Sequence, residues 1–443
     1  MPLVAETGQS HAFPKTLMKT TVARVLMLVE NNSYPRDTRV RAEAEALRGA
    51  GYQVSVISPS AKGQVWHELV NGVRVYRFPQ NSEAHGFLGY VWEYGFSTVA
   101  IFLLSLLVWA RDGFDVIHAA NPSDTLVFIA AFHKLFGKHF VFDHHDLSPE
   151  MYNANFGNRA SRVVYQVLIW LEKFSCRLAD HVIATNESYK RVEMERSGIP
   201  AERITIVRNG PDLSRFPAGD SDPALRSTGK TVIGYVGLMG PHDGIDCLLR
   251  SLNYLVYAMK RTDFVCVLVG GVSESMLNTL NALKTQLGLD DFVRFTGWVS
   301  EADKLRYLRS ADICVDPDPS NPFNDRSTMI KIAEYMAMGK PVIAFDLPEN
   351  RFTAQEAGLF VPANDDPAFA RGLATLMDDP IRRQVMGAFG RRRVETELAW
   401  CYSVPKLLSV YRSVLPEARR EPIPANTDRR QTGPILAETR KRS

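Results

Sequence analysis

Short apolar runs alternate with helix-length segments along most of the chain, and this alternation restricts the possible folds more than any other feature. From Arg24 onward the runs are RVLMLVE, QVSVIS, FDVIHAA, HFVFDHH, DHVIAT and ITIVRN. A second series starts at Thr231 and consists of TVIGYVG, FVCVLVGG, VRFTGWV, DICVDPD, KPVIAFD and GLFVP. Apolar runs of this length, separated by helices, predict parallel strands joined by helical crossovers.

The segment between the two series, Val207 to Lys230, is rich in Gly, Pro, Asp and Ser, which are typical of loops. We therefore expect an α/β fold of two doubly wound, Rossmann-like parallel-sheet domains that face each other across a cleft. The expected parts are a loose leader at 1–21, an N-terminal domain at 22–208, a linker at 209–229, a C-terminal domain at 230–398, a helix at 399–417 packing back towards the first domain, and a disordered basic tail at 418–443. Ligands of such folds bind at the carboxyl ends of the strands.

The charge of the chain is concentrated at one end. The whole sequence of 443 residues carries +3, but residues 418–443 hold seven Lys or Arg and three acidic residues, which is +4. The remaining chain therefore sums to −1, and this balance argues against a nucleic-acid-binding surface.

Cysteine spacing and one apolar segment bear on location. The five cysteines show no metal or redox spacing, which indicates a reduced, cytoplasmic environment, and no secretory signal is expected at the N-terminus. The segment Gly95 to Ala110, GFSTVAIFLLSLLVWA, leaves three interpretations open: a buried helix, contact with one face of a bilayer, or a membrane span. A span is disfavoured because it needs ~20 residues. Peripheral attachment to the inner face of the cell membrane therefore remains open.

The stretch NDRSTMIKIAEYMAMGKPVIAFD, residues 324 to 346, follows a predicted strand and holds two cations and one carboxylate. We expect a helix that begins near Ser327 or Thr328, and helix N-termini favour phosphate. Lys331 and Glu334 are three residues apart and therefore share one face of the helix, while Arg326 stands at its entry. The arrangement offers cations for a diphosphate and a carboxylate for ribose hydroxyls; a solvated ion pair is the alternative.

A glycine-rich turn, GYVGLMGPHDGID, follows the first strand of the second series. Gly237, Gly240 and Gly244 lie between this strand and the next helix, so backbone amides there could approach a phosphate closely. The pattern is neither a P-loop nor a complete dinucleotide fingerprint. A plain tight turn is the alternative interpretation.

In the first domain, FVFDHHDLSPE places His145 and Asp146 directly after a strand, where they could hydrogen-bond a polar ligand. Metal binding by His144 together with His145 is not expected, because adjacent residues of an extended chain face opposite ways. Loop capping by Asp146 and Ser148 is the alternative for this segment.

Two further segments allow more than one interpretation. Asp37 and Arg39 follow the first strand and could face the cleft, but an N-cap role for Asp37 or Thr38 explains this segment equally well. The acids of DPD, Asp316 and Asp318, could hold Mg²⁺ beside a diphosphate. We expect no metal there, because cations downstream can neutralise a diphosphate.

At these residues the sequence resembles the family-4 retaining glycosyltransferases of the GT-B fold, of the bacterial kind that builds exopolysaccharide, capsule or lipopolysaccharide. The resemblance runs from Arg24 to Leu415 and is most specific at STMIKIAEYMAMGKPVIAFD, supported by FDHHDLSPE and VRNGPD. It implies that the second domain binds a nucleotide sugar, with Glu334 on the ribose and Gly237 to Gly240 cradling the diphosphate. It also implies that His145 contacts the donor sugar near the reacting carbon.

The sequence departs from the family pattern at two places. Many members carry an Arg and a Lys in the glycine loop, where this chain has only His242, and a glutamate where this chain has Arg326. We infer that Arg326, Lys331 and Arg208 supply the positive charge for the leaving diphosphate instead. Ser327 is assigned to the same nucleotide-sugar site, and Asp37, Arg39 and Asp146 to the acceptor side.

These expectations combine into one leading function and two alternatives. The leading hypothesis is retaining transfer of a sugar from a nucleotide-diphosphate donor to a lipid-linked glycan acceptor at the cytoplasmic membrane face, without a metal, a cofactor or a nucleic-acid partner. The resemblance implies that the leaving phosphate itself takes the acceptor's proton. The alternatives are a sugar-nucleotide epimerase of the same architecture and a catalytically silent scaffold in a polysaccharide assembly complex.

Overall fold

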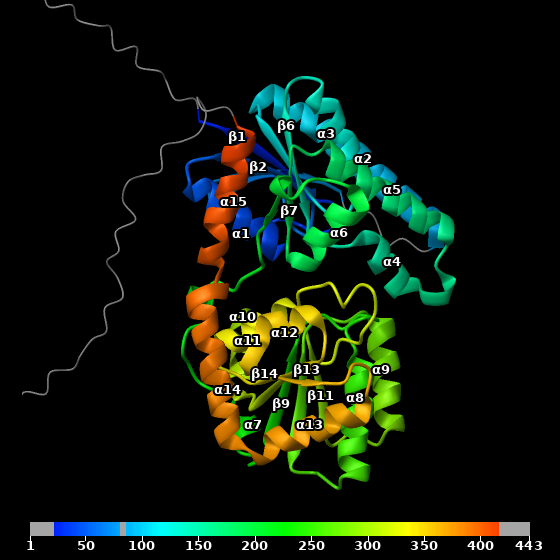
Figure 1. Cartoon of the computed structure of the whole chain (residues 1–443), viewed down its shortest axis with the longest axis vertical. Coiled ribbons are helices and arrows are strands. Elements are labelled where there is room, and N and C mark those ends of the chain that lie inside the picture. Colours follow the sequence, from blue (N-terminus) through cyan, green and yellow to red (C-terminus); the bar gives the residue numbers. More distant parts are fainter. Residues whose placement is uncertain (1–21, 80–85, 416–443) are drawn as a thin grey trace, which may run out of the picture.

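The computed structural model describes residues 22–79 and 86–415, which form two α/β domains arranged end to end (Figure 1). The first sheet has eight strands in the order β3-β4-β2-β1-β5-β6-β7-β8. All neighbouring strands are parallel except β3 and β4. The strands are β1 (Arg24–Leu28), β2 (Gln53–Pro59), β3 (His67–Val70), β4 (Val73–Phe78), β5 (Val116–Ala120), β6 (His139–His144), β7 (His181–Ala184) and β8 (Ile204–Ile206).

Helices cover both faces of this sheet because successive strand residues point to opposite sides. In β1, Leu26 and Leu28 belong to one apolar core, whereas Val25 and Met27 belong to the other. The first core includes residues of α2 (Gly86–Arg111), α3 (Leu126–Lys134) and α5 (Arg162–Leu178), and the second includes residues of α1 (Thr38–Gly49). The remaining helices of this part of the chain are α4 (Ser148–Phe156) and α6 (Glu187–Ser197).

The second sheet has six parallel strands in the order β11-β10-β9-β12-β13-β14. They are β9 (Thr231–Val236), β10 (Phe264–Val269), β11 (Val293–Gly297), β12 (Ile313–Asp316), β13 (Val342–Phe345) and β14 (Gly358–Val361). The helices are α7 (Pro223–Arg226), α8 (Ile245–Asn253), α9 (Glu274–Gln286), α10 (Glu301–Ser310), α11 (Ile330–Ala337), α12 (Pro348–Ala354), α13 (Asp366–Asp378) and α14 (Pro380–Arg393).

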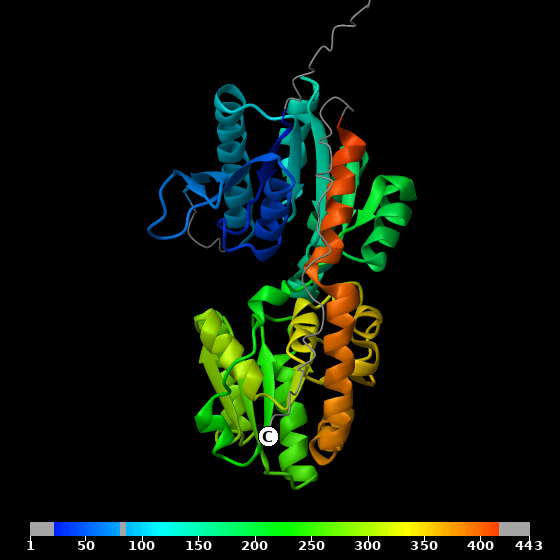
Figure 2. The ribbon, with the colours of Figure 1, turned by 90° about the vertical axis from the view of Figure 1, so that its left-hand side faces the viewer.

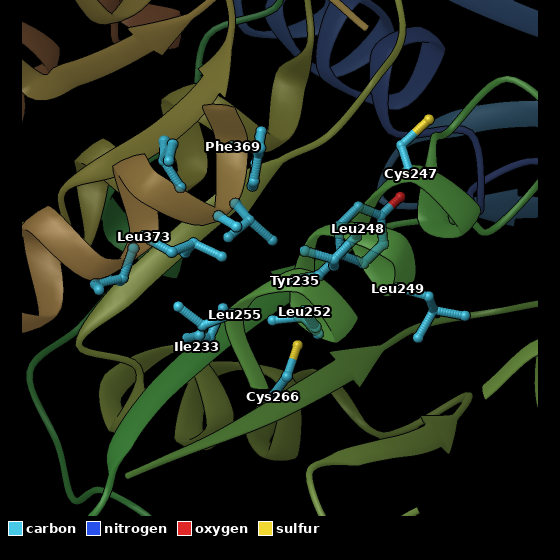
Figure 3. Packing of buried hydrophobic residues seen from close by; sticks show 14 of the residues in the cluster. Ile233, Tyr235, Cys247, Leu248, Leu249, Leu252, Leu255, Cys266, Phe369 and Leu373 are labelled. Atoms are coloured by element: carbon cyan, nitrogen blue, oxygen red, sulfur yellow. The ribbon is translucent and has the colours of Figure 1, made fainter. Parts of the chain in front are cut away.

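Figure 3 shows the core on one face of this second sheet. Ile233 and Tyr235 of β9 pack there with Leu248 and Leu252 of α8 and with Phe369 of α13, all of them fully buried. This packing joins the sheet and its helices into one unit. The loops at the carboxyl ends of β9 and β12 are therefore anchored on a packed core.

The last helix, α15 (Trp400–Val414), leaves the second domain and packs on the first. Figure 2 shows α15 continuing the direction of α14 and lying against the N-terminal sheet. Leu407, Val410 and Tyr411 are fully buried in the core that α1 also covers. The linker passes close to the segment just before α15, and this explains why residue 210 is a glycine. A Cβ on Gly210 would lie 2.0 Å from the carbonyl oxygen of Leu398.

The fold class predicted from the sequence is confirmed: both sheets are doubly wound, and each of the twelve predicted runs contains a strand. The prediction missed β3 and β4 at the edge of the first sheet. It also placed the start of one helix too early, since α11 begins at Ile330 with Met329 as its N-cap. The preceding residues form a separate turn, in which the Asn321 side chain accepts from the amides of Phe323 and Asn324.

Candidate active site

The loops that follow β9 and β12 are packed directly on each other. Gly244 is the N-cap of α8 and has φ 64°, a left-handed conformation that glycine adopts readily. A Cβ at this position would lie 1.9 Å from the carbonyl oxygen of Pro317, so a larger residue would force the loops apart. Gly244 is therefore required for backbone packing, and this close approach sets the distance between the glycine loop and the two acids of DPD.

Lys331, in the first turn of α11, points into the acids at the end of β12. Its Nζ lies 2.6 Å from Asp318 Oδ1 and 3.1 Å from Asp316 Oδ1, and Asp243 of the glycine loop is 3.9 Å away. The ammonium also lies over the Tyr235 ring, 5.0 Å from its centroid. Only 11% of the lysine side chain is exposed. Lys331 is thus the centre of a mostly buried cluster, which we call the Lys331 cluster: Lys331, Asp243, Asp316 and Asp318.

The Lys331 cluster has more carboxyl groups than cations, and its pKa shifts follow from that imbalance. Burial and the neighbouring charge of Asp318 raise the pKa of Asp316 to about 7, although Lys331 opposes that shift. Burial also raises the pKa of Asp318, although Lys331 opposes that shift. Burial disfavours the Lys331 ammonium, but the carboxylates outweigh burial and raise the pKa of Lys331. The lysine therefore stays charged while one acidic partner is close to taking up a proton.

From Gly237 to Gly240, the glycine loop uses three backbone amides inside the protein, one of which is the Met239 amide that donates to the carbonyl oxygen of Gly271 at 3.0 Å. The amide of Gly237 donates to the carbonyl oxygen of Val269 at 3.0 Å, and the amide of Gly240 donates to Asp243 Oδ2 at 2.7 Å. His242 in the same loop reaches the other domain, where its Nδ1 lies 3.1 Å from Asn155 Oδ1 of α4. A phosphate held by Gly240 would therefore compete with the Asp243 carboxylate.

Glu334 stands one turn after Lys331 on α11 but has a different neighbour. Its carboxylate lies 3.7 Å from Lys304 of α10, and 23% of the side chain is exposed. Burial raises the pKa of Glu334, and the charge of Lys304 partly opposes that shift. A half-buried carboxylate with one cation beside it can still accept from two hydroxyl groups.

In the first domain, His145 follows β6 and is held by two side chains. Its Nδ1 lies 3.1 Å from Asp143 Oδ2, and its backbone amide donates to Asn121 Oδ1 at 2.8 Å. The same Asn121 oxygen accepts from the amide of Asp146 at 3.0 Å. Burial disfavours the imidazolium, but Asp143 outweighs burial and raises the pKa of His145. Asn121 was not singled out from the sequence, because its role arises only when β5 and β6 pair.

Asp143 is shared with a buried charge network in which Arg39 lies. The Arg39 guanidinium is 2.5 Å from Asp143 Oδ1 and 3.2 Å from Glu43 Oε1, and 5% of its side chain is exposed. Arg39 was predicted to face the cleft on the acceptor side, and the structure shows its guanidinium buried against Asp143 and Glu43. The Arg39 side chain lies inside the domain because the buried carboxylates of Glu43 and Asp143 need a counter-charge.

His118 completes this network from β5. Its Nε2 lies 3.2 Å from Glu43, and its Nδ1 is 2.7 Å from the hydroxyl of Tyr411 on α15. Burial disfavours the charged ring, but the nearby carboxylates of Asp143 and Glu43 outweigh burial and raise the pKa of His118 to about 9. Glu43, His118 and Asp143 lie close enough together to bind a metal ion, but Arg39 already supplies their counter-charge.

The other predicted acceptor-side residues, Asp37 and Asp146, lie in different surroundings. Asp37 is the N-cap of α1, where its side chain accepts from the amide of Val40 at 2.9 Å, so the capping alternative describes its contact. Asp146 stays beside His145, and burial raises its pKa. His144 faces away from His145, with its Nδ1 3.0 Å from Glu193.

Several contacts bring the two domains together at the loop before α11. The Arg326 guanidinium lies 3.6 Å from Glu150 of α4, and the Asn186 side chain donates to the Arg326 carbonyl oxygen at 2.8 Å. Ser327 Oγ lies 3.1 Å from the Tyr189 hydroxyl. Phe323 of this loop packs into a core of the first domain. The carboxyl ends of the two sheets therefore face each other.

Arg208, from the segment after β8, lies at the same boundary. Its guanidinium is 3.4 Å from Glu349 of α12 and stacks over Phe352 at 4.0 Å from the ring centroid. Burial lowers the pKa of Arg208, and Glu349 opposes that shift. The structure thus places Arg208 among residues of α12 rather than beside Lys331.

Two facing Rossmann-like domains, with a glycine loop and an acid-bearing helix in the second, define the GT-B class of nucleotide-sugar-dependent enzymes. Comparison with known proteins agrees with this class. Residues 37–210 match the family described as "Glycosyl transferase 4-like domain", and residues 230–379 match "Glycosyl transferases group 1". The chain belongs to the group 1, GT4-like glycosyltransferases, which confirms the resemblance seen in the sequence.

Individual relatives support the same assignment. The chain is 28% identical to a phosphatidyl-myo-inositol mannosyltransferase of Mycobacterium leprae over 84% of this chain and 91% of the relative. It is 31% identical to a D-inositol 3-phosphate glycosyltransferase of Thermomonospora curvata, but over 53% of this chain and 57% of that relative. Among solved structures, sucrose-phosphate synthase from Thermosynechococcus elongatus has a TM-score of 0.73 at 20% identity, covering 88% of this chain and 98% of that one. The last similarity shows the fold alone.

Proposed function

We propose that this glycosyltransferase moves a sugar, with retention of configuration, from a nucleotide-diphosphate donor to a lipid-linked glycan acceptor in bacterial surface polysaccharide synthesis. The observation that carries the proposal is the meeting of the two sheets: His145 follows β6, the Lys331 cluster follows β12, and the contact between His242 and Asn155 joins the glycine loop to α4. A donor bound on the second domain would then present its sugar to the first.

The second domain supplies candidate groups for both ends of a nucleotide diphosphate. Glu334 would accept from the ribose hydroxyls, and the turn from Gly237 to Gly240 would lie along the diphosphate. Arg326 and Lys331 would stabilise the charge that develops on the leaving phosphate, since preorganised cations are typically the largest catalytic contribution. Lys331 would have to exchange part of its contact with Asp318 for phosphate.

On the first domain, His145 would contact the donor sugar. Its Nδ1 faces Asp143, so its Nε2 is the atom left to point away from the sheet. The leaving phosphate would take the acceptor's proton on the same face of the sugar, so the proposal requires no base from the protein.

The test is a two-stage assay on the full chain. Calorimetric titration with UDP and GDP first determines whether a nucleotide binds. Incubation with a panel of nucleotide sugars, with and without a bacterial lipid extract, then separates transfer from reaction of the donor alone. We expect nucleotide binding and acceptor-dependent release of nucleoside diphosphate. Conversion of the donor sugar without an acceptor would instead indicate an epimerase.

One observation favours the alternative of a silent scaffold. The charge of Lys331 is matched by Asp318 and Asp316, and the amide of Gly240 is engaged by Asp243. A chain in which these contacts persist would bind nucleotides weakly or not at all. The same calorimetric titration decides between the two, because a silent scaffold gives no heat of binding with either nucleotide.

A further inference from the structure

The first domain exposes a group of large apolar side chains on three of its helices and one turn. They come from α2, α3, the turn after α3, and α5, and we call them the apolar face: Trp92, Val99, Leu103, Leu107, Phe128, Leu135, Phe136, Val163, Val167 and Trp170. Trp92 is 68% exposed, Leu135 82% and Val163 72%. Patches of this kind on a folded chain generally mark a contact surface.

The three helices lie side by side, so these side chains form one surface. Phe102 of α2 packs edge-on against Phe132 of α3, with ring centroids 5.1 Å apart. Phe128 of α3 lies 6.3 Å from Trp170 of α5. Figure 1 shows α2, α3 and α5 together on the side of the first domain away from α15. Along α5, an open hollow is lined by Val163, Val167 and Trp170.

The helix α2 contains the apolar segment whose role the sequence left open. Trp92–Arg111 is long and apolar enough to cross a membrane, and 22% of its most apolar stretch is buried. Ile101, Ser105 and Val108 form its buried inner side, and Val99, Leu103 and Leu107 form its exposed outer side. Because β4 before it and β5 after it belong to one sheet, α2 is held against that sheet. A surface position therefore fits this helix and a span does not.

The charges on these helices identify the partner. Among the described side chains of α2, α3 and α5, the exposed charged residues are Arg111, Arg162 and Arg177, and none is acidic. Apolar side chains flanked by arginines match a bilayer with anionic headgroups, which takes up the apolar groups and attracts the cations.

We propose that the apolar face docks the enzyme on an anionic bilayer, with α2, α3 and α5 lying in the headgroup region. The inference rests on the proposed lipid-linked acceptor and locates its entry. The helix α4 packs beside α5, and its Asn155 contacts His242 in the glycine loop. A lipid-linked acceptor in the bilayer would thus reach the site along α4.

The test is flotation of the full chain with vesicles of phosphatidylcholine alone or mixed with phosphatidylglycerol. We expect binding to the mixed vesicles and weaker binding to the neutral ones. The double substitution Val99→Asp and Leu103→Asp places two charges one turn apart on the apolar face and should weaken vesicle binding at least about tenfold. The matched control is Ile381→Asp with Val385→Asp, which has the same spacing on α14 at residues 73% and 65% exposed, and it should bind like the wild type.

Three results would overturn the proposal. The first is absence of wild-type binding to the mixed vesicles. The second is unchanged binding by the Val99 and Leu103 variant, which would assign any attachment to another part of the chain, such as the basic residues at 418–443. The third is a light-scattering result in which the wild type and the Ile381 and Val385 control are dimers and the Val99 and Leu103 variant is a monomer. A second copy of the chain would then cover the apolar face. Calorimetry with nucleotide on the same samples reports separately on the proposed function.

Discussion

Asp318 accepts a 2.6 Å hydrogen bond from the ammonium group of Lys331, and this contact ties the end of β12 to the first turn of α11. The lysine that the sequence suggested as a phosphate-binding cation is therefore held by a carboxylate. Phosphate and Asp318 would compete for it, and substitution at either residue should reveal that competition.

Replacement of Lys331 by alanine should lower turnover at least about a hundredfold, because a cation beside the leaving phosphate would be lost. We expect the chain to remain folded, since Asp316, with a pKa of about 7, can take up a proton once the ammonium is gone. Turnover and the far-ultraviolet circular dichroism spectrum check both parts. Wild-type turnover in this variant would contradict the assignment.

Replacement of Glu334 by glutamine should weaken nucleotide binding about tenfold, because hydrogen bonds to a charged acceptor contribute about 1.5–3 kcal/mol. Glu301 serves as the matched control: it lies near the same Lys304, with its carboxylate 3.1 Å from Nζ, but on α10. Glu301→Gln should leave affinity unchanged. Calorimetric titration with UDP and GDP measures both variants, and equal losses would show that only the charge near Lys304 matters.

Replacement of Asp143 by asparagine should lower the pKa of His145, because the charge of Asp143 is what outweighs burial of the ring. The pH dependence of turnover should shift with it. The substitution also removes a partner of buried Arg39 and should destabilise the fold by roughly 3–5 kcal/mol. Proton NMR titration of His145, followed at a temperature where the variant is folded, distinguishes the two effects. An unchanged pKa of His145 would contradict the conclusion that Asp143 stabilises its charged form.

Stability should fall as the pH rises from about 6.5 to about 9. The pKa of His118 is raised to about 9, so the folded chain retains this proton after the unfolded chain has lost it, and the contribution is complete below 6.5 and lost above 9. A shift of this size corresponds to roughly 3 kcal/mol. The pKa values of His144 and His145 are also raised, so the slope has more than one source. In thermal denaturation across this range, His118→Gln should flatten the decline, and a slope equal to that of the wild type would refute this explanation.

The sequence predicted the fold well because apolar strand residues repeat on a short local scale. Each of the runs from RVLMLVE to GLFVP contains a strand, since burial on both faces leaves an uninterrupted apolar signature. The missed strands, β3 and β4, lie at a sheet edge, where the pattern mixes polar residues such as His67, Arg74 and Arg77 with apolar ones.

The position of the site could be predicted from the sequence, but the contacts between its charged residues could not. That functional groups follow β6, β9 and β12 comes from the general geometry of parallel sheets. Which cation meets which carboxylate depends on contacts between distant segments: Arg39 meets Asp143, and Lys331 meets Asp318. Asn121 could not be found from the sequence for the same reason, since its partners His145 and Asp146 follow the next strand, β6.

The packing of α15 on the first domain also governs how the chain matures during synthesis. The face of the first sheet that buries Val410 and Tyr411 stays incomplete until the ribosome has finished the whole second domain. During synthesis the first domain therefore exposes an apolar surface until α15 is available. The second domain can complete its folding before the first domain does. Cutting the chain ahead of Trp400 should leave the first domain, rather than the second, prone to aggregation.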